Sequence, residues 1–135
     1  MSSMIIPSLR YRDAHAMIDW LCDVFGFRRH MIVEDGVGGV AHAQLTLGDG
    51  MFMLGSTRDD AYGRLLRDTR DGVTGSSYVV VADADAVHAR AVAAGAPIVM
   101  PIRDEAYGGR GFGLRDPEGH VWYVGTYDPW ARPAG

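Results

Sequence analysis

Polar and apolar residues alternate with a period of two over residues 40–47, VAHAQLTL, a pattern typical of a β-strand with two different faces. A glycine-containing turn over 48–50 follows, and an apolar stretch over 51–56 returns from it, so this part of the chain predicts a hairpin. One face of the hairpin is wholly apolar, as expected beneath a helix. The other face carries His42 and Gln44, and we expect it to be concave.

Residues 14–25 place their apolar side chains at helical spacing instead. Asp13 precedes them as a predicted N-cap, and Gly26 follows as a predicted stop. Further strands are expected at about 5–11 and 27–34.

The same order of elements recurs in the second half of the chain. Sliding the sequence by 70 positions lays Asp13 on Asp83 and Met53 on Tyr123. The stretch 107–127 then reads as a second hairpin, in which a glycine-rich loop feeds a strand and residues 116–119 form the turn. The later hairpin offers matching positions on the concave face, which are Phe112, Leu114, Val121 and Tyr123, and we expect Trp122 on the helix side.

The repeat predicts an α+β fold of two tandem βαβββ modules, which form a curved mixed sheet around a concave cavity with the helices outside. We expect one domain over residues 1–135. Its parts are module 1 at about 5–56, a charged linker at 57–75, module 2 at about 76–127 and a tail at 128–135.

Composition narrows the possible partners. The net charge of −4 and the pI near 5.6 argue against nucleic acid, and no apolar run approaches the ~18 residues that a membrane helix needs. The single cysteine, Cys22, cannot form an internal disulfide, which favours a reducing, cytoplasmic location. Cys22 lies in the helical pattern and is expected in the core.

Three motifs in this order resemble the vicinal oxygen chelate superfamily, which includes glyoxalase I, extradiol dioxygenases and the fosfomycin- and bleomycin-resistance proteins. They are LRYRD at 9–13 running into a helix, VADAD at 81–85 running into AAG at 93–95, and DPEGH at 116–120 running into the last strand. The resemblance implies metal ligands at four positions, which hold Ile6, Met53, Ser76 and Tyr123 here. None of these residues is a usual ligand for the divalent ions of the family's enzymes. The resemblance therefore implies a protein without a metal or another cofactor, and without the reactions that need the ion as a Lewis acid.

The candidate ligand-binding residues are Arg10, His42, Gln44, Met53, Ser76, Tyr78, Arg110, Phe112 and Tyr123. His42 and Gln44 either contact a ligand or satisfy one another. Arg10 either holds a planar or carboxylate ligand or pairs with a carboxylate at the rim. Tyr107 and Arg110 are candidates for a mobile lid.

Two functions remain open at this point. The first is a metal-free binding protein that resembles the bleomycin-resistance branch and takes an aromatic or cationic organic ligand in the cavity. The alternative is a glyoxalase-like lyase, isomerase or other enzyme that re-uses the cavity with His42 as general base. A metal enzyme with relocated ligands is a third possibility. Sheet edges and an open cavity mouth predict a symmetric homodimer.

Overall fold

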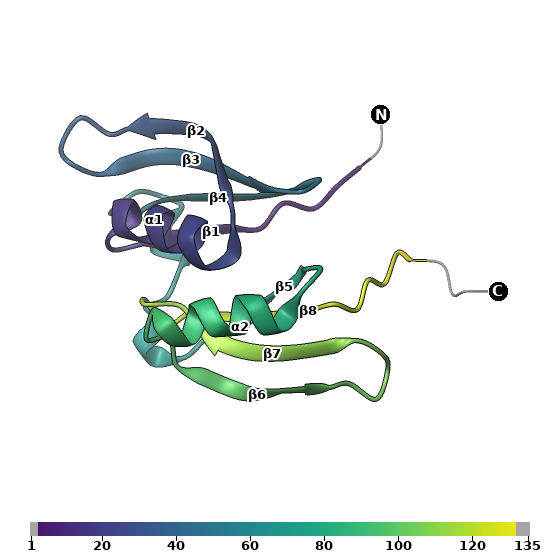
Figure 1. The fold of residues 1–135 in the computed structure, drawn as a ribbon. Helices are drawn as coiled ribbons and strands as arrows, with labels where there is room; N and C mark the ends of the chain where they lie inside the picture. The colour runs from purple at the N-terminus through teal and green to yellow at the C-terminus, as the bar shows by residue number, and fades with distance from the viewer. Residues whose placement is uncertain (1–2, 132–135) are drawn as a thin grey trace. The chain divides into compact units, whose positions relative to one another are not determined.

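A computed structural model describes residues 3–131 of the chain. The chain divides into two compact units, Met1–Asp71 (unit 1) and Gly72–Gly135 (unit 2). Both have the order βαβββ (Figure 1). The prediction of an α+β fold with two βαβββ modules is confirmed, and each module has its own four-stranded mixed sheet.

Unit 1 has the strand order β1-β4-β3-β2, with β1 parallel to β4 and the other neighbours antiparallel. Its elements are β1 (Ser8–Tyr11), α1 (Ala14–Phe25), β2 (Arg28–Glu34), β3 (Val40–Leu47) and β4 (Gly50–Ser56), followed by two short 3₁₀ turns, η1 (Gly63–Leu65) and η2 (Thr69–Asp71). The strand expected over 5–11 is shorter than predicted, because its regular pairing begins only at Ser8.

Unit 2 repeats this topology with the strand order β5-β8-β7-β6. Its elements are β5 (Ser77–Val80), α2 (Ala84–Ala93), β6 (Ile98–Asp104), β7 (Arg110–Arg115) and β8 (Val121–Gly125). Hydrogen bonds repeat as well: Val40 N donates to Ser56 Oγ at 2.9 Å, and Arg110 N donates to Thr126 Oγ1 at 2.9 Å.

The helices begin and end where the sequence indicates. Asp13 accepts from Ala16 N at 3.1 Å and caps α1, and Asp83 accepts from Ala86 N at 3.0 Å and caps α2. Gly26 ends α1 in the left-handed conformation, with φ of 88°, that a residue with a side chain adopts only at a cost.

Each helix covers one face of its own sheet and forms a core with it. The largest fully buried side chains of unit 1 include Tyr11, Met17 and Leu45, and in unit 2 the largest buried side chain is Trp122, at 2% exposed. The opposite face of each sheet carries no helix of its own unit, and we call it the helix-free face. Functional residues must therefore be sought there.

The structure corrects the expectation for Phe112. Its side chain is fully buried, and its ring packs edge-on against His88 of α2 at 4.9 Å, so Phe112 lies on the helix side together with its strand partner Val124. Leu114, fully buried opposite Trp122, is corrected in the same way.

The misplacement of Phe112 arises because the 70-residue offset fails along one strand. In β3 the partner of Leu54 is Ala43, three residues after Val40, whereas in β7 the partner of Val124 is Phe112, two residues after Arg110. A register shift beside Val40 marks the extra residue as a bulge. Counted between equivalent paired residues, the turn between β7 and β8 is one residue longer than the turn between β3 and β4, so the 70-residue offset holds again in β8. Gly113, and not Leu114, therefore occupies the position equivalent to Gln44.

The Asp116 turn connects β7 to β8 through a buried carboxylate. Asp116 is 2% exposed, and its Oδ1 accepts from Glu118 N at 3.0 Å and from His120 N at 3.1 Å. Its Oδ2 accepts from Trp122 Nε1 at 3.0 Å. The expected turn at 116–119 is confirmed, and its first residue also orients the largest side chain of the core.

Within residues 3–131, no helix has both the length and the apolar character that crossing a membrane requires.

Candidate functional site

The helix-free face of unit 1 carries four of the predicted ligand-binding residues. Gln44 on β3 lies opposite Met53 on β4, and Met53 in turn is paired with Ser8 on β1. Arg10 follows two residues after Ser8, and His42 two residues before Gln44, so alternation brings both to this face. The structure thus places Arg10, His42, Gln44 and Met53 on one side of one sheet.

His42 and Gln44 satisfy one another on this face. The amide nitrogen of Gln44 lies 3.1 Å from His42 Nε2. Because an amide nitrogen only donates, His42 Nε2 is the acceptor of this bond. The atom that would act as a general base is therefore already engaged.

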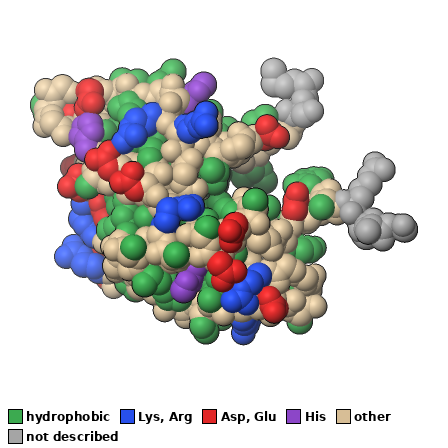
Figure 2. All heavy atoms as spheres, in the orientation of Figure 1, with side chains coloured by type: hydrophobic (Ala, Val, Ile, Leu, Met, Phe, Trp, Pro, Cys, Tyr) green, Lys and Arg blue, Asp and Glu red, His purple; other side chains and the backbone are tan. Residues whose placement is uncertain are grey.

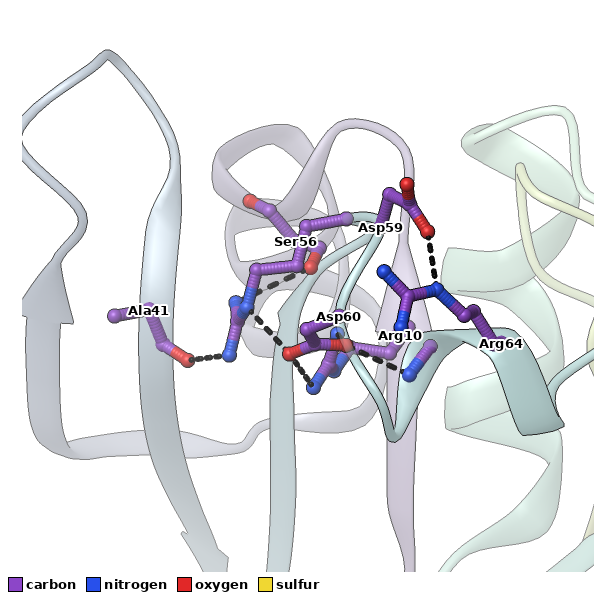
Figure 3. A network of polar contacts seen from close by, with 8 residues as sticks. Arg10, Ala41, Ser56, Asp59, Asp60 and Arg64 are labelled. Atoms are coloured by element: carbon purple, nitrogen blue, oxygen red, sulfur yellow. Dashed lines mark hydrogen bonds and ion pairs between the residues drawn. The ribbon is translucent and has the colours of Figure 1, made fainter.

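Arg10 is held by a carboxylate from the segment after β4. Its side chain is 12% exposed, and its two terminal nitrogens lie 3.4 and 3.2 Å from the two oxygens of Asp60 (Figure 3). The guanidinium also lies 5.0 Å from the centre of the Tyr62 ring. A backbone hydrogen bond from Gly63 and the bond from Arg10 lower the pKa of Asp60 to about 2. Of the two readings for Arg10, the structure matches pairing with a carboxylate.

Beside this network lies an open depression of about 370 Å³ lined by Thr57, Arg58, Asp59, Gly63 and Arg64. Both of its arginines have partners. Arg58 contacts Asp60 at 3.0 Å and the carbonyl oxygens of Ser56 and Ala41, and Arg64 contacts Asp59 at 2.8 Å (Figure 3). The depression therefore offers an anion no uncommitted guanidinium among the residues that line it.

The helix-free face of unit 2 carries two stacked tyrosines. Tyr78 on β5 lies opposite Tyr123 on β8, and their ring centres are 6.2 Å apart at an interplanar angle of 24°. Each ring lies beside at least one glycine of the neighbouring strand, a residue that has no side chain. A Cβ on Gly111 would lie 3.1 Å from Cε1 of Tyr123, and a Cβ on Gly113 would lie 3.2 Å from Cδ2 on the opposite edge of the same ring.

The same relation holds for the second ring, since a Cβ on Gly125 would lie 2.6 Å from the Tyr78 hydroxyl. Gly111, Gly113 and Gly125 therefore make room for the tyrosines on the sheet surface. The structure places Gly111 and Gly113 inside β7 rather than in the glycine-rich loop expected there. A Cβ on Gly111 would also meet the backbone oxygen of Val124 at 2.7 Å, and one on Gly113 would also meet Met100 at 3.1 Å, so neither position has room for a side chain. We call Tyr78 and Tyr123 with these glycines the tyrosine platform.

A buried carboxylate adjoins the platform. Glu105, whose side chain is 6% exposed, accepts a hydrogen bond from the Tyr123 hydroxyl and contacts Arg103 Nε at 3.3 Å. Burial, then the Glu105 bond and the Glu105 charge, raise the pKa of Tyr123 to about 12. The phenol consequently stays protonated at neutral pH.

Two more tyrosines surround the platform. The Tyr78 hydroxyl donates to the backbone oxygen of Tyr127 at 2.7 Å, and the Tyr127 ring meets the Tyr107 ring edge-on at 5.0 Å. Burial raises the pKa of Tyr78, and the charges of Tyr107 and Glu105 add to the effect. Four tyrosines and one carboxylate thus lie close enough to affect the pKa values of the two platform tyrosines.

Arg110 is anchored by carboxylates on either side. Its side chain contacts Asp85 at 3.0 Å and Asp104 at 3.3 Å, while its backbone nitrogen is bound by Thr126. On the face shown in Figure 2, arginine side chains lie in several separate groups, some of them beside carboxylates. These bonds leave no support for Arg110 as part of a mobile lid. Ser76 is exposed and lies immediately before β5.

The residues at the family's metal positions do not fit a divalent ion. Met53 offers a thioether, Ile6 offers no donor atom, and the Tyr123 hydroxyl donates its proton to Glu105. Within residues 3–131, no group of three or more His, Cys, Asp or Glu side chains is arranged to hold a metal ion.

Sequence reasoning missed Glu105 and Tyr127. A signal for Glu105 was present in the repeat, because the 70-residue offset lays Asp35 on Glu105. Asp35 N donates to Gly39 O at 3.0 Å, and Glu105 N donates to Gly109 O at 2.9 Å, so the two acids begin equivalent turns. Asp35 uses its carboxylate within its turn, accepting from Val37 N and Gly39 N, whereas the longer Glu105 reaches Tyr123.

Comparison with known proteins gives consistent results. Residues 5–124 match the family model described as the Glyoxalase/Bleomycin resistance protein/Dioxygenase superfamily. The crystal structure of TioX from Micromonospora sp. ML1 is 33% identical, with a TM-score of 0.72, and the match covers 92% of this chain and 98% of that one.

Two further relatives differ more in sequence. The fosfomycin resistance protein FosX from Mesorhizobium loti shares the fold at 18% identity and a TM-score of 0.65, over 96% of this chain and 95% of its own. An uncharacterised protein of Mycobacterium bovis is 29% identical over 121 residues, which is 88% of this chain and 80% of the relative. With a family model that spans nearly the whole chain and a repeat that the structure reproduces, this protein belongs to the glyoxalase/bleomycin resistance/dioxygenase superfamily.

Proposed function

We propose that this protein binds a small aromatic or cationic organic molecule without a metal ion and releases it chemically unchanged. The observation that carries the proposal is the tyrosine platform, where two stacked rings lie over glycines on a helix-free sheet face. Stacking and burial against such rings favour flat organic ligands. Sequestration of a toxic compound, as in the bleomycin-resistance branch, is the role we propose for this binding.

The proposed site includes Tyr78 and Tyr123 from unit 2. Arg10, His42, Gln44 and Met53 of unit 1, and Ser76 and Arg110 of unit 2, stay in the proposal as candidate ligand-binding residues, and Phe112 leaves it because it is buried beneath α2. We further propose a homodimer in the cytoplasm. Light scattering at micromolar concentration that gives only the monomer mass would contradict the dimer.

The alternative is an enzyme with His42 as general base. The hydrogen bond between Gln44 and His42 Nε2 speaks against it, because a base needs that lone pair free. A metal-dependent reaction is disfavoured by the residues at the family's ligand positions. Elemental analysis of untagged, dialysed protein should accordingly find no stoichiometric divalent ion.

A thermal-shift screen with aromatic antibiotics and α-keto metabolites, followed by mass spectrometry of each hit, tests the function. We expect aromatic hits that are recovered unchanged. Tyr78→Ala and Tyr123→Ala should each weaken such a hit by roughly 1–3 kcal/mol, the scale of a lost aromatic contact. Trp130→Ala is the matched control, because Trp130 is an aromatic residue that is 93% exposed. A hit that wild type alters chemically and His42→Ala does not would establish the enzyme instead.

A further inference from the structure

The hydroxyl groups of the tyrosine platform are already committed. Tyr78 donates its proton to the backbone oxygen of Tyr127, and Tyr123 donates its proton to Glu105. Neither phenol has a second proton to offer a ligand. What the platform presents is the π-face of each ring, so recognition here depends on stacking and on the charge of the ligand.

The platform is also electron-rich. A phenol that donates to a carboxylate acquires part of the character of a phenolate, which makes the face of its ring more negative and more attractive to a cation. The side chain of Glu105 is 6% exposed, whereas its ion-pair partner Arg103 is 57% exposed. Solvent therefore screens the arginine more than it screens Glu105.

The influence of Glu105 extends over both rings. Its charge contributes to the raised pKa of Tyr78 as well as to that of Tyr123. Negative potential from one buried carboxylate thus coincides with two stacked aromatic faces, and Tyr107 and Tyr127 supply further rings beside them.

We propose that the tyrosine platform with Glu105 is a binding site for organic cations whose charge is alkylated or delocalised, such as quaternary ammonium groups and cationic heteroaromatic rings. A primary ammonium is a poorer fit, since it needs several acceptors to replace its water, and both Glu105 oxygens already have donors. This inference rests on the proposed binding function and names the class of its ligand.

N-methylquinolinium and 1-methylnaphthalene test the proposal, because they have the same shape and differ by one positive charge. Titration of the full chain with each, followed by NMR shifts of the tyrosine ring signals, gives two dissociation constants. We expect wild type to prefer the cation on the order of 10-fold, the scale of a partly desolvated cation–π contact.

Two variants assign this preference to its cause. Glu105→Gln keeps the volume and removes the charge, and Tyr123→Phe keeps the ring and removes the phenol–carboxylate bond. Each should lower the affinity for N-methylquinolinium by about 3- to 10-fold and leave 1-methylnaphthalene nearly unchanged. Glu34→Gln is the matched control, because it removes the same charge from an exposed position of unit 1. Circular dichroism verifies that every variant is folded.

Equal affinity of wild type for the two probes would overturn the cation proposal and leave the proposed function standing. A preference for the cation that Glu105→Gln and Glu34→Gln reduce equally would also overturn it, since net charge alone would explain the result. Failure of both probes to shift Tyr78 or Tyr123 would overturn the cation site and the platform as the ligand site together.

Discussion

Replacing Tyr123 by phenylalanine removes one hydroxyl, keeps the ring in place and so isolates the bond to Glu105. A hydrogen bond to a charged group contributes about 1.5–3 kcal/mol to stability. The pKa of Tyr123 is raised to about 12 by burial first and by the Glu105 bond second, so the bond adds to the preference for the protonated phenol. We expect Tyr123→Phe to lower the free energy of unfolding by about 1–3 kcal/mol at pH 7.

The pH dependence of this loss provides the sharper test. The folded-state pKa of Tyr123 is raised, so its contribution is fully present below pH 10 and is lost as the pH rises from 10 through about 12. Urea unfolding of wild type and variant should give a constant difference from pH 6 to 9 that closes above pH 10.

Tyr107→Phe is the control for this experiment. It removes a tyrosine hydroxyl from the same cluster, and Tyr107 is 56% exposed, so water can replace what the hydroxyl loses. Its stability should match that of wild type. A Tyr123→Phe loss below about 0.5 kcal/mol, or a difference that persists unchanged to pH 12, would refute the role assigned to the Glu105 bond.

Three further predictions concern the scaffold. Asp13→Ala should lower the free energy of unfolding by about 0.5–2 kcal/mol in urea, because it removes the N-cap of α1. Asp116→Asn should cost about 1–3 kcal/mol, since an amide has one accepting oxygen where the carboxylate has two, and either Trp122 Nε1 or the backbone donors of the turn would lose their acceptor. The bond from Gly63 first, and then that from Arg10, depress the pKa of Asp60, so its contribution should be complete above about pH 4 and lost as the pH falls through about 2. Wild type should therefore lose stability over that range relative to Asp60→Asn.

The elements that depend on local chemistry could be predicted from the sequence. Asp13 and Gly26 bound α1 because a side-chain acceptor and a left-handed glycine are needed at those two places. The repeat predicted the topology of unit 2 and the strand position of Tyr123, which lies opposite Tyr78 as Met53 lies opposite Ser8.

The face of Phe112 could not be predicted, because it depends on one bulged residue in β3 and one additional residue in the second turn. These two extra residues shift the register of β7 relative to β3, and they cancel outside this strand, so the overall offset of 70 residues does not reveal them. A one-residue slip in register moves a side chain to the other face of the sheet. The tyrosine platform could not be predicted either, because its surface depends on glycines, which have no side chain. Glycines in a strand otherwise indicate a loop or a weak strand.

Asp35 and Glu105 begin equivalent turns, and their side chains differ by one methylene group. A single-base substitution in a codon is enough to convert one acid into the other. A chain built from two copies of a module can therefore place the carboxylate of the proposed ligand site in one half and use the equivalent carboxylate within a turn of the other half, at no change in topology. The two copies in such a chain share the same fold and differ in chemistry. Exchanging Asp35 and Glu105 would test how small a sequence change is enough to produce that difference.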